Sequence, residues 1–264
     1  MKHNTKTQEQ IEIMRKAGKM LGIVLEDTLK QVKPGVSEIE LDTFADKKIH
    51  ELGGFPGFKK VDGYKHAICV ATNDVVVHGI PKQRVLNEGD IITIDAGVYL
   101  DGFHSDMAET VRVQGKGERG KKDEIDRFLD AGKRAMYAGI KQAKPGNRVG
   151  HISQAMQQII ERENGYSVVR SLVGHGVGRQ LHEDPQIPGY LQGKIEKTPE
   201  LVTGMTIAIE IIYNMGKKEV EYEGSDDWTI VSKDGSLSGV FERTLVITEN
   251  GPQLLTAYPG EEIL

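Results

Sequence analysis

The sequence predicts an α/β protein in the α+β sense: a curved antiparallel sheet made of two pseudo-twofold-related halves and backed by helices. One observation is that helix patterns followed by strand patterns run twice along the 264 residues. Another is that segment 33–54, KPGVSEIELDTFADKKIHELGG, repeats its pattern at 144–165, KPGNRVGHISQAMQQIIERENG. A third is that 88–98 is echoed at 203–213. Two such halves side by side would leave a cleft between them.

The sequence predicts a single domain. No linker or low-complexity segment interrupts it, and its length suits one large domain. We therefore predict a single domain over 1–264, with internal halves at about 7–115 and 120–255 that share one core. A chain of this length hides about 75 % of its unfolded surface, which allows a sizeable core.

Two helices open the first half. A capping-box pattern, Thr7 with Gln10, begins a helix whose apolar spacing continues to Val32. A second capping box, Ser37 with Glu40, begins the next helix, which paired glycines end. Short strands with an Asn-Asp turn follow in 67–81, AICVATNDVVVHGIP.

A hairpin completes this half, and the second half repeats the plan. Alternating apolar residues surround the turn Asp101-Gly102 in 90–113, which predicts a β-hairpin. Segment 116–122, KGERGKK, is predicted to be a charged loop. Helices are expected over 123–143 and 148–164. Strands are expected in SVVRSLVGHGVG, MTIAIEIIY, DWTIVS and FERTLVIT.

Composition narrows the class of protein. The net charge of −5 and the pI of about 5.9 disfavour a broad basic face, so we expect no specific nucleic-acid recognition. One cysteine, Cys69, excludes an internal disulfide and suits a reducing compartment. The N-terminus lacks the apolar region of a signal peptide, and no run reaches ~18 apolar residues. We expect a cytoplasmic protein that does not enter membranes.

Carboxylates in apolar strands indicate a cation site. Asp95 and Asp106 stand on opposite arms of the hairpin, where like charges are costly unless a cation joins them. The alternative is structural: one of these two aspartates caps a turn, and the other is an ordinary surface residue. Glu210 occupies the repeat equivalent of Asp95, although pairing with an arginine would also explain it. Glu242 in FERTLVIT is likewise a carboxylate in a predicted apolar strand.

One histidine completes this set. Segment 171–190, SLVGHGVGRQLHEDPQIPGY, places His175 between Gly174 and Gly176, which we expect to let the backbone approach the cation. Four carboxylates and one imidazole suit a pair of first-row divalent ions such as Mn, Fe, Co or Zn. Two such ions can share a water and lower its pKa toward neutrality, which favours hydrolysis.

Five ordered motifs carry a family resemblance. VVHGIP, IDAGVYLDGFHSD, GHGVGRQLHEDPQIP, TIAIE and FERTLVIT stand in the order and spacing of the type I methionine aminopeptidases, over about residues 7–255. The chain therefore resembles members of the creatinase/aminopeptidase superfamily, whose fold is called pita-bread. The resemblance places the family's five metal ligands on Asp95, Asp106, His175, Glu210 and Glu242.

The resemblance also implies residues that contact the substrate. His78 would lie where the amide of the second residue passes, His182 would donate to the scissile carbonyl oxygen, and Glu210 would move the proton to the leaving amine. A methionine pocket would be lined by Phe58, Val61, Tyr64, Cys69, Leu181 and Trp228. A monovalent cation, Na or K, would lie at Asn73, Val75 and Ser238.

Four positions depart from the family's pattern. Ile211 stands where proline usually follows the first glutamate ligand, and Arg243 where histidine usually follows the second. Val61 and Leu181 replace aromatic residues that are common in relatives, which predicts a less selective methionine pocket.

The resemblance implies removal of the N-terminal methionine from nascent chains, with a preference for a small second residue. It implies a monomer that meets its substrates near the ribosomal exit tunnel. The alternatives are an X-Pro aminopeptidase of the same superfamily, which usually carries a further N-terminal domain, and an inactive relative that serves as a binding protein. Inactive relatives lose ligands, and here all five positions are filled.

Overall fold

The computed structural model describes residues 4–115, 123–224 and 226–261, so the predicted charged loop 116–122 lies outside the described residues. In each half two α-helices come first, and strands with short helical turns follow. The first half contains α1 (Gln8–Leu29), α2 (Glu38–Glu51), β1 (Phe55–Pro56), η1 (Gly57–Lys60), β2 (Ile68–Thr72), β3 (Val75–Val77), β4 (Ile91–Leu100) and β5 (Phe103–Arg112). The second contains α3 (Glu124–Gln142), α4 (Val149–Gln157), η2 (Gln158–Glu163), β6 (Ser167–Val168), β7 (Gly174–Gly176), β8 (Glu183–Ile187), η3 (Ile195–Lys197), β9 (Thr206–Asn214), β10 (Val220–Tyr222), β11 (Ile230–Ser232), β12 (Ser238–Thr248) and β13 (Gly251–Leu254).

The predicted helix starts are confirmed. The Thr7 hydroxyl accepts from the Gln10 amide, and the Gln10 side chain accepts from the Thr7 amide. The Glu40 carboxylate accepts from both the amide and the hydroxyl of Ser37. The helix expected over 148–164 is present but changes geometry, because α4 continues as the π-helical turn η2.

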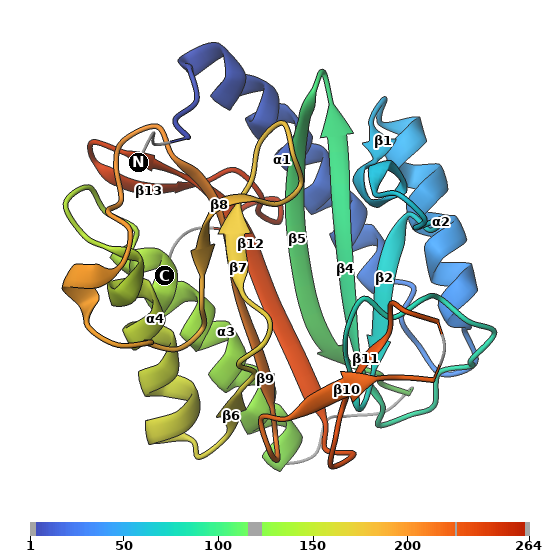
Figure 1. The fold of residues 1–264 in the computed structure, drawn as a ribbon. Helices are drawn as coiled ribbons and strands as arrows, with labels where there is room; N and C mark the ends of the chain where they lie inside the picture. Colours follow the sequence, from blue (N-terminus) through green and yellow to red (C-terminus); the bar gives the residue numbers. More distant parts are fainter. Residues whose placement is uncertain (1–3, 116–122, 225, 262–264) are drawn as a thin grey trace.

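The strands form one large antiparallel sheet, as predicted. Its order is β1-β4-β5-β12-β9-β7-β8, with β2 on β4, β6 on β9 and β13 on β12. The four long helices cover one face, α1 and α2 behind the first half and α3 and α4 behind the second (Figure 1). Each pair buries its own apolar cluster against the sheet. A small sheet, β10-β11-β3, lies at one end.

Four short strands were not predicted: β1, β8, β10 and β13. Two of them contain proline, Pro185 in β8 and Pro252 in β13, which demotes a sequence pattern from strand to edge or bend. Both lie on edges or side branches of the sheet, where a missing donor is tolerated. Among the described residues, no helix has the length and apolar character that crossing a bilayer requires.

The two halves meet between β5 and β12. Only two positions pair there, Glu242 with Ala108 and Arg243 with Met107. On either side a threonine hydroxyl stands in for backbone groups: Thr110 bonds both the amide and carbonyl of Val240 at 2.8 Å. Thr244 does the same for Asp106, at 3.1 and 2.8 Å. We call this junction the seam.

Candidate metal centre

Five neighbouring strands bring the predicted ligands to one face of the sheet: Asp95 on β4, Asp106 on β5, Glu242 on β12, Glu210 on β9 and His175 on β7. Directly paired residues point to the same face. Ala108 pairs with Asp95 on one side and Glu242 on the other. Glu242 pairs with Glu210, and His175 with Ala208. The register across the seam therefore aligns side chains from both halves.

The imidazole of His175 lies among the carboxylates. Its Nε2 is 3.8 Å from Asp106 Oδ2, and 4.0 Å from both Glu210 Oε1 and Glu242 Oε1. Its Nδ1 lies 2.9 Å from the carbonyl oxygen of Gly176. Because a carbonyl only accepts, Nδ1 carries the proton and Nε2 presents its lone pair to the carboxylates. Burial lowers the pKa of His175 to about 4, so the ring is neutral at pH 7.

The four carboxylates are buried close to one another. Burial, with Glu210 nearby, raises the pKa of Asp106 to about 8, and burial beside Asp95 raises that of Glu210 to about 8. The pKa values of Asp95 and Glu242 are raised for the same reasons. Among the described residues that line the centre there is no lysine or arginine.

One carboxylate oxygen of the centre is buried and has no hydrogen-bond donor. This oxygen is Oδ1 of Asp95. A buried carboxylate oxygen without a donor or cation is costly. Three of the five residues, Asp106, His175 and Glu242, already place one potential ligand atom each within 4.8 Å of the others. Hard oxygens and one neutral imidazole are a donor set that fits divalent first-row ions.

The glycines that flank His175 lie close to neighbouring backbones. A Cβ on Gly176 would lie 2.3 Å from the carbonyl oxygen of Asp184, and one on Gly174 would lie 2.7 Å from that of Ala208. The two glycines therefore allow β7 to approach the backbones of β8 and β9, which fixes where His175 points. The expectation that these glycines also admit the backbone to a cation stays a prediction.

A cavity of about 300 Å³ opens above these five residues. All six residues predicted for the methionine pocket line it: Phe58, Val61, Tyr64, Cys69, Leu181 and Trp228. They form one apolar cluster, in which the rings of Tyr64 and Trp228 meet edge-on at 5.1 Å. Val77, Ile212 and 171–173 also line the cavity and were not predicted. The motifs of the resemblance were the available signal, since Val77 lies in VVHGIP and 171–173 directly precede GHGVG.

The two remaining predicted histidines also line the cavity. His78 adopts a left-handed backbone conformation with φ 56°, and burial lowers its pKa to about 4. The ring of His182 lies 4.4 Å from that of His175 at 73° and reaches solvent. Desolvation by the cavity walls lowers the pKa of His182 as well. Both rings are therefore neutral at pH 7 and can donate one hydrogen bond each.

The residues expected around a monovalent cation lie at one end of the sheet. The Ser238 amide donates to the carbonyl oxygen of Asn73 at 2.8 Å, and β3, which carries Val75, contacts β12. Asn73 is held with φ 60°, and its side chain bonds Asp90 and the Ile91 amide. Asn73 and Ser238 are thus together, and their part in a cation site stays a prediction.

Comparisons with known proteins point in one direction. Residues 12–249 match metallopeptidase family M24. The chain is 44 % identical to a methionine aminopeptidase of Bacillus subtilis over 95 % of its own length and 98 % of the relative. A methionine aminopeptidase structure from Thermotoga maritima superposes with a TM-score of 0.89 at 39 % identity, covering 96 % and 99 % of the two chains. A prolidase from Pyrococcus furiosus gives a TM-score of 0.70 at 25 % identity and covers 97 % of this chain and 66 % of the prolidase.

Proposed function

The chain belongs to metallopeptidase family M24, and from this premise we propose how its centre removes an N-terminal methionine. The activity is that of a metal-dependent hydrolase acting at the chain terminus, as in the methionine aminopeptidases that it matches over nearly its full length. The observation that carries the proposal is the convergence of Asp95, Asp106, His175, Glu210 and Glu242 beneath a cavity with an apolar wall.

These five residues would hold two divalent ions, with Co, Mn, Fe or Zn as the candidates. Bound there, such ions would supply an activated water near neutral pH and polarise the scissile carbonyl. The four carboxylates would balance the charge of the pair. The His175 Nε2 would be the single nitrogen ligand, held in that tautomer by Gly176. A monovalent ion at Asn73, Val75 and Ser238 would be a separate addition.

The chain's own residues would select and orient the substrate. Phe58, Val61, Tyr64, Cys69, Leu181 and Trp228 form the wall that would take the methionine side chain. His182 would donate to the carbonyl oxygen as negative charge develops on it. His78 would meet the amide of the second residue. Glu210 would accept a proton from the attacking water at Oε1 and deliver it to the leaving amine.

The alternative of an X-Pro aminopeptidase is not favoured. Identity is 44 % with a methionine aminopeptidase and 25 % with the prolidase. Nascent polypeptide N-termini as substrates, a contact with the ribosome, a monomeric state and a cytoplasmic location remain predictions.

Peptide cleavage after metal removal tests the proposal. We expect the chelated protein to be inactive, and Mn²⁺ or Co²⁺ to restore release of methionine from Met-Ala-Ser while Ala-Pro-Ser stays intact. Cleavage of Ala-Pro-Ser in preference, or full activity of the metal-free protein, would overturn it.

A further inference from the structure

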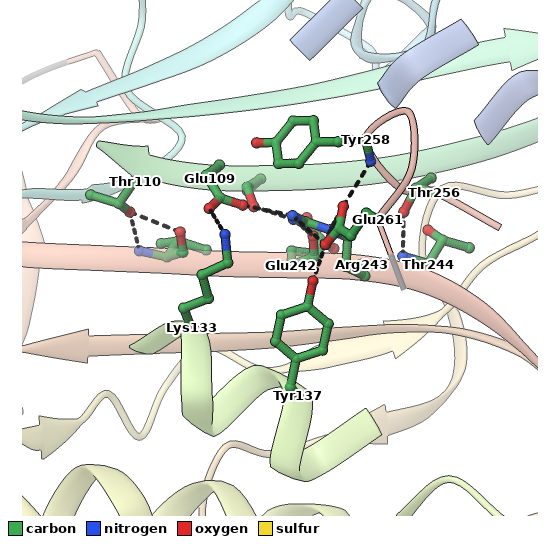
Figure 2. Close-up of polar contacts among 12 residues, drawn as sticks. Glu109, Thr110, Lys133, Tyr137, Glu242, Arg243, Thr244, Thr256, Tyr258 and Glu261 are labelled. Atoms are coloured by element: carbon green, nitrogen blue, oxygen red, sulfur yellow. Dashed lines mark hydrogen bonds and ion pairs between the residues drawn. The ribbon is translucent and has the colours of Figure 1, made fainter. Parts of the chain in front are cut away.

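Arg243 is a fully buried guanidinium directly behind the metal centre. Its side chain is 0 % exposed, and it follows Glu242 on β12, so the two side chains point to opposite faces of the sheet. Figure 2 shows it enclosed by Glu109 on β5, by Glu261 near the end of the described chain, and by the Tyr258 ring, whose centroid lies 4.9 Å away. The site proposed above makes no use of this cluster.

Each nitrogen of this guanidinium donates to at least one oxygen. Nε and Nη2 both lie 3.0 Å from Glu261 Oε1, and Nη2 also donates to Glu109 Oε2 at 2.7 Å. Nη1 donates to the carbonyl oxygens of Glu242 at 2.8 Å and Ala108 at 3.2 Å. Five N–H groups in a rigid fork match these acceptors, and a lysine, with three donors on one nitrogen, cannot replace them.

The bond from Nη1 to Ala108 crosses the seam, because Arg243 itself belongs to β12. Ala108 belongs to β5 and Glu242 to β12, and they are one of only two pairs that join these strands. Glu109 and Arg243 each immediately precede a seam threonine, Thr110 and Thr244, so their ion pair spans the same junction from the helix-covered face. Arg243 therefore bonds both strands at the junction where only two residue pairs join them.

The C-terminal segment, residues 255–261, closes the cluster. Glu261 accepts from the hydroxyl of Tyr137 on α3 and from the Tyr258 amide at 2.7 Å (Figure 2). Thr256 accepts from the Thr244 amide at 2.8 Å. On the other flank, Lys133 lies 3.2 Å from Glu109 Oε1, so two cations face the two carboxylates. The cluster is neutral and ties the end of the chain to the strand that carries Glu242.

We propose that Arg243, held by Glu109 and Glu261, is a positioning residue for the metal centre. It sets the spacing of β5 and β12, and hence the distance between the Asp106 and Glu242 carboxylates on the opposite face. This inference rests on the proposed function, because it concerns residues assigned there as ligands. It assigns a role in metal binding to a C-terminal segment that does not line the cavity.

Two variants test it. Arg243→Lys keeps the charge and removes the bonds across the seam, whereas Glu261→Gln keeps the side-chain shape and weakens the hold of the C-terminal segment. Arg134→Met, on the exposed side of α3, is the matched control. The readouts are the Kd for Mn²⁺ by calorimetry, the melting temperature of the metal-free protein, and kcat and KM for Met-Ala-Ser at saturating Mn²⁺.

We expect Arg243→Lys to weaken Mn²⁺ binding by about 10–100-fold, as loss of outer partners does at other metal sites. Glu261→Gln should weaken it less, and both should lower kcat more than they change KM. Variants that melt at a lower temperature but keep the Mn²⁺ Kd and kcat of the control would show a merely structural cluster and overturn the inference. A wild-type protein that binds no Mn²⁺ would instead overturn the proposed function.

Discussion

His175 is the one nitrogen donor among five converging side chains, and its chemistry is set by a backbone oxygen. With Nδ1 bound to Gly176, only Nε2 can face the carboxylates. Replacing His175 with Ala should reduce cleavage of Met-Ala-Ser by more than about 100-fold, because a ligand matters more than the outer partners whose loss costs 10–100-fold in affinity.

The control for this change is His50→Ala, whose side chain is 51 % exposed on α2. Melting temperature and bound metal should be measured with activity. If His175→Ala keeps wild-type activity, the residue does not belong to the centre. If activity is lost while bound metal is unchanged, His175 contacts the substrate instead.

The cavity wall permits a second prediction at this scale. Val61 and Leu181 line it with aliphatic side chains, so we expect the pocket to accept norleucine, and to some extent leucine, beside methionine. Val61→Tyr or Leu181→Phe should narrow this tolerance, since a methylene in such a pocket is worth only ~1–3 kcal/mol. The measurement is the ratio of kcat/KM for Met-Ala-Ser and Leu-Ala-Ser.

Val85→Tyr, at a position 50 % exposed and outside the cavity, controls for added bulk. A ratio that stays within about twofold, or ~0.4 kcal/mol, in both cavity variants would mean that neither position controls the pocket.

Helix α1 meets the C-terminal segment with no room to spare. A Cβ on Gly18 would lie 2.0 Å from the carbonyl oxygen of Leu255, and one on Gly22 would lie 1.9 Å from that of Ala257. Alanine normally favours a helix by about 1 kcal/mol over glycine. Here Gly18→Ala should instead destabilise the protein by about 1–3 kcal/mol, because the helix must move away from the segment.

Urea unfolding measures this effect. Lys19→Ala, at an exposed position of the same helix, should change stability by less than about 0.5 kcal/mol. An unfolding midpoint for Gly18→Ala at or above that of the wild type would contradict the close contact.

Local signals predicted the elements well where they were strong. The capping boxes at Thr7 and Ser37 fixed the starts of two helices, and the turn Asp101-Gly102, with φ of 46° and 90°, fixed the hairpin. The strand β8 was missed because its EDPQI contains a proline, and its pairing depends on β7 rather than on its own pattern. Such strands depend on tertiary contacts, which a local pattern does not contain.

The same distinction applies to the centre. Charged residues in apolar strands, and the resemblance, identified Asp95, Asp106, Glu210 and Glu242. Neither could give the register of β5 on β12, since it depends on threonine side chains at the seam. The sequence showed Arg243 as a departure from the family's pattern but gave it no role. Its partners Glu109 and Glu261 are distant in sequence, so only the structure brings them together.

For the whole molecule, the centre couples metal binding to stability and pH. In the metal-free protein the pKa values of Asp106 and Glu210 are about 8, whereas they are about 4 in an unfolded chain. The folded state therefore holds more protons between these values. The stability that these protons provide is fully present below about pH 4 and is lost as pH rises through about 8.

Metal reverses this trend, because ions compete with protons for the carboxylates. We expect Mn²⁺ to raise the melting temperature. The difference in melting temperature between the metal-loaded and metal-free protein, which we call the gap, should be larger at about pH 8 than at about pH 6. Calorimetric scans at both pH values measure the gap. A transition that neither chelator nor Mn²⁺ moves would contradict the coupling.

We infer that both halves of the fold supply one metal centre across the seam. Anomalous diffraction from crystals grown with Zn²⁺ tests it most directly. We expect two peaks beneath the cavity, with His175 Nε2 and oxygens of Asp95, Asp106, Glu210 and Glu242 at about 2.0–2.2 Å from them. Peaks bound by residues of one half alone, or none between these five side chains, would contradict the claim.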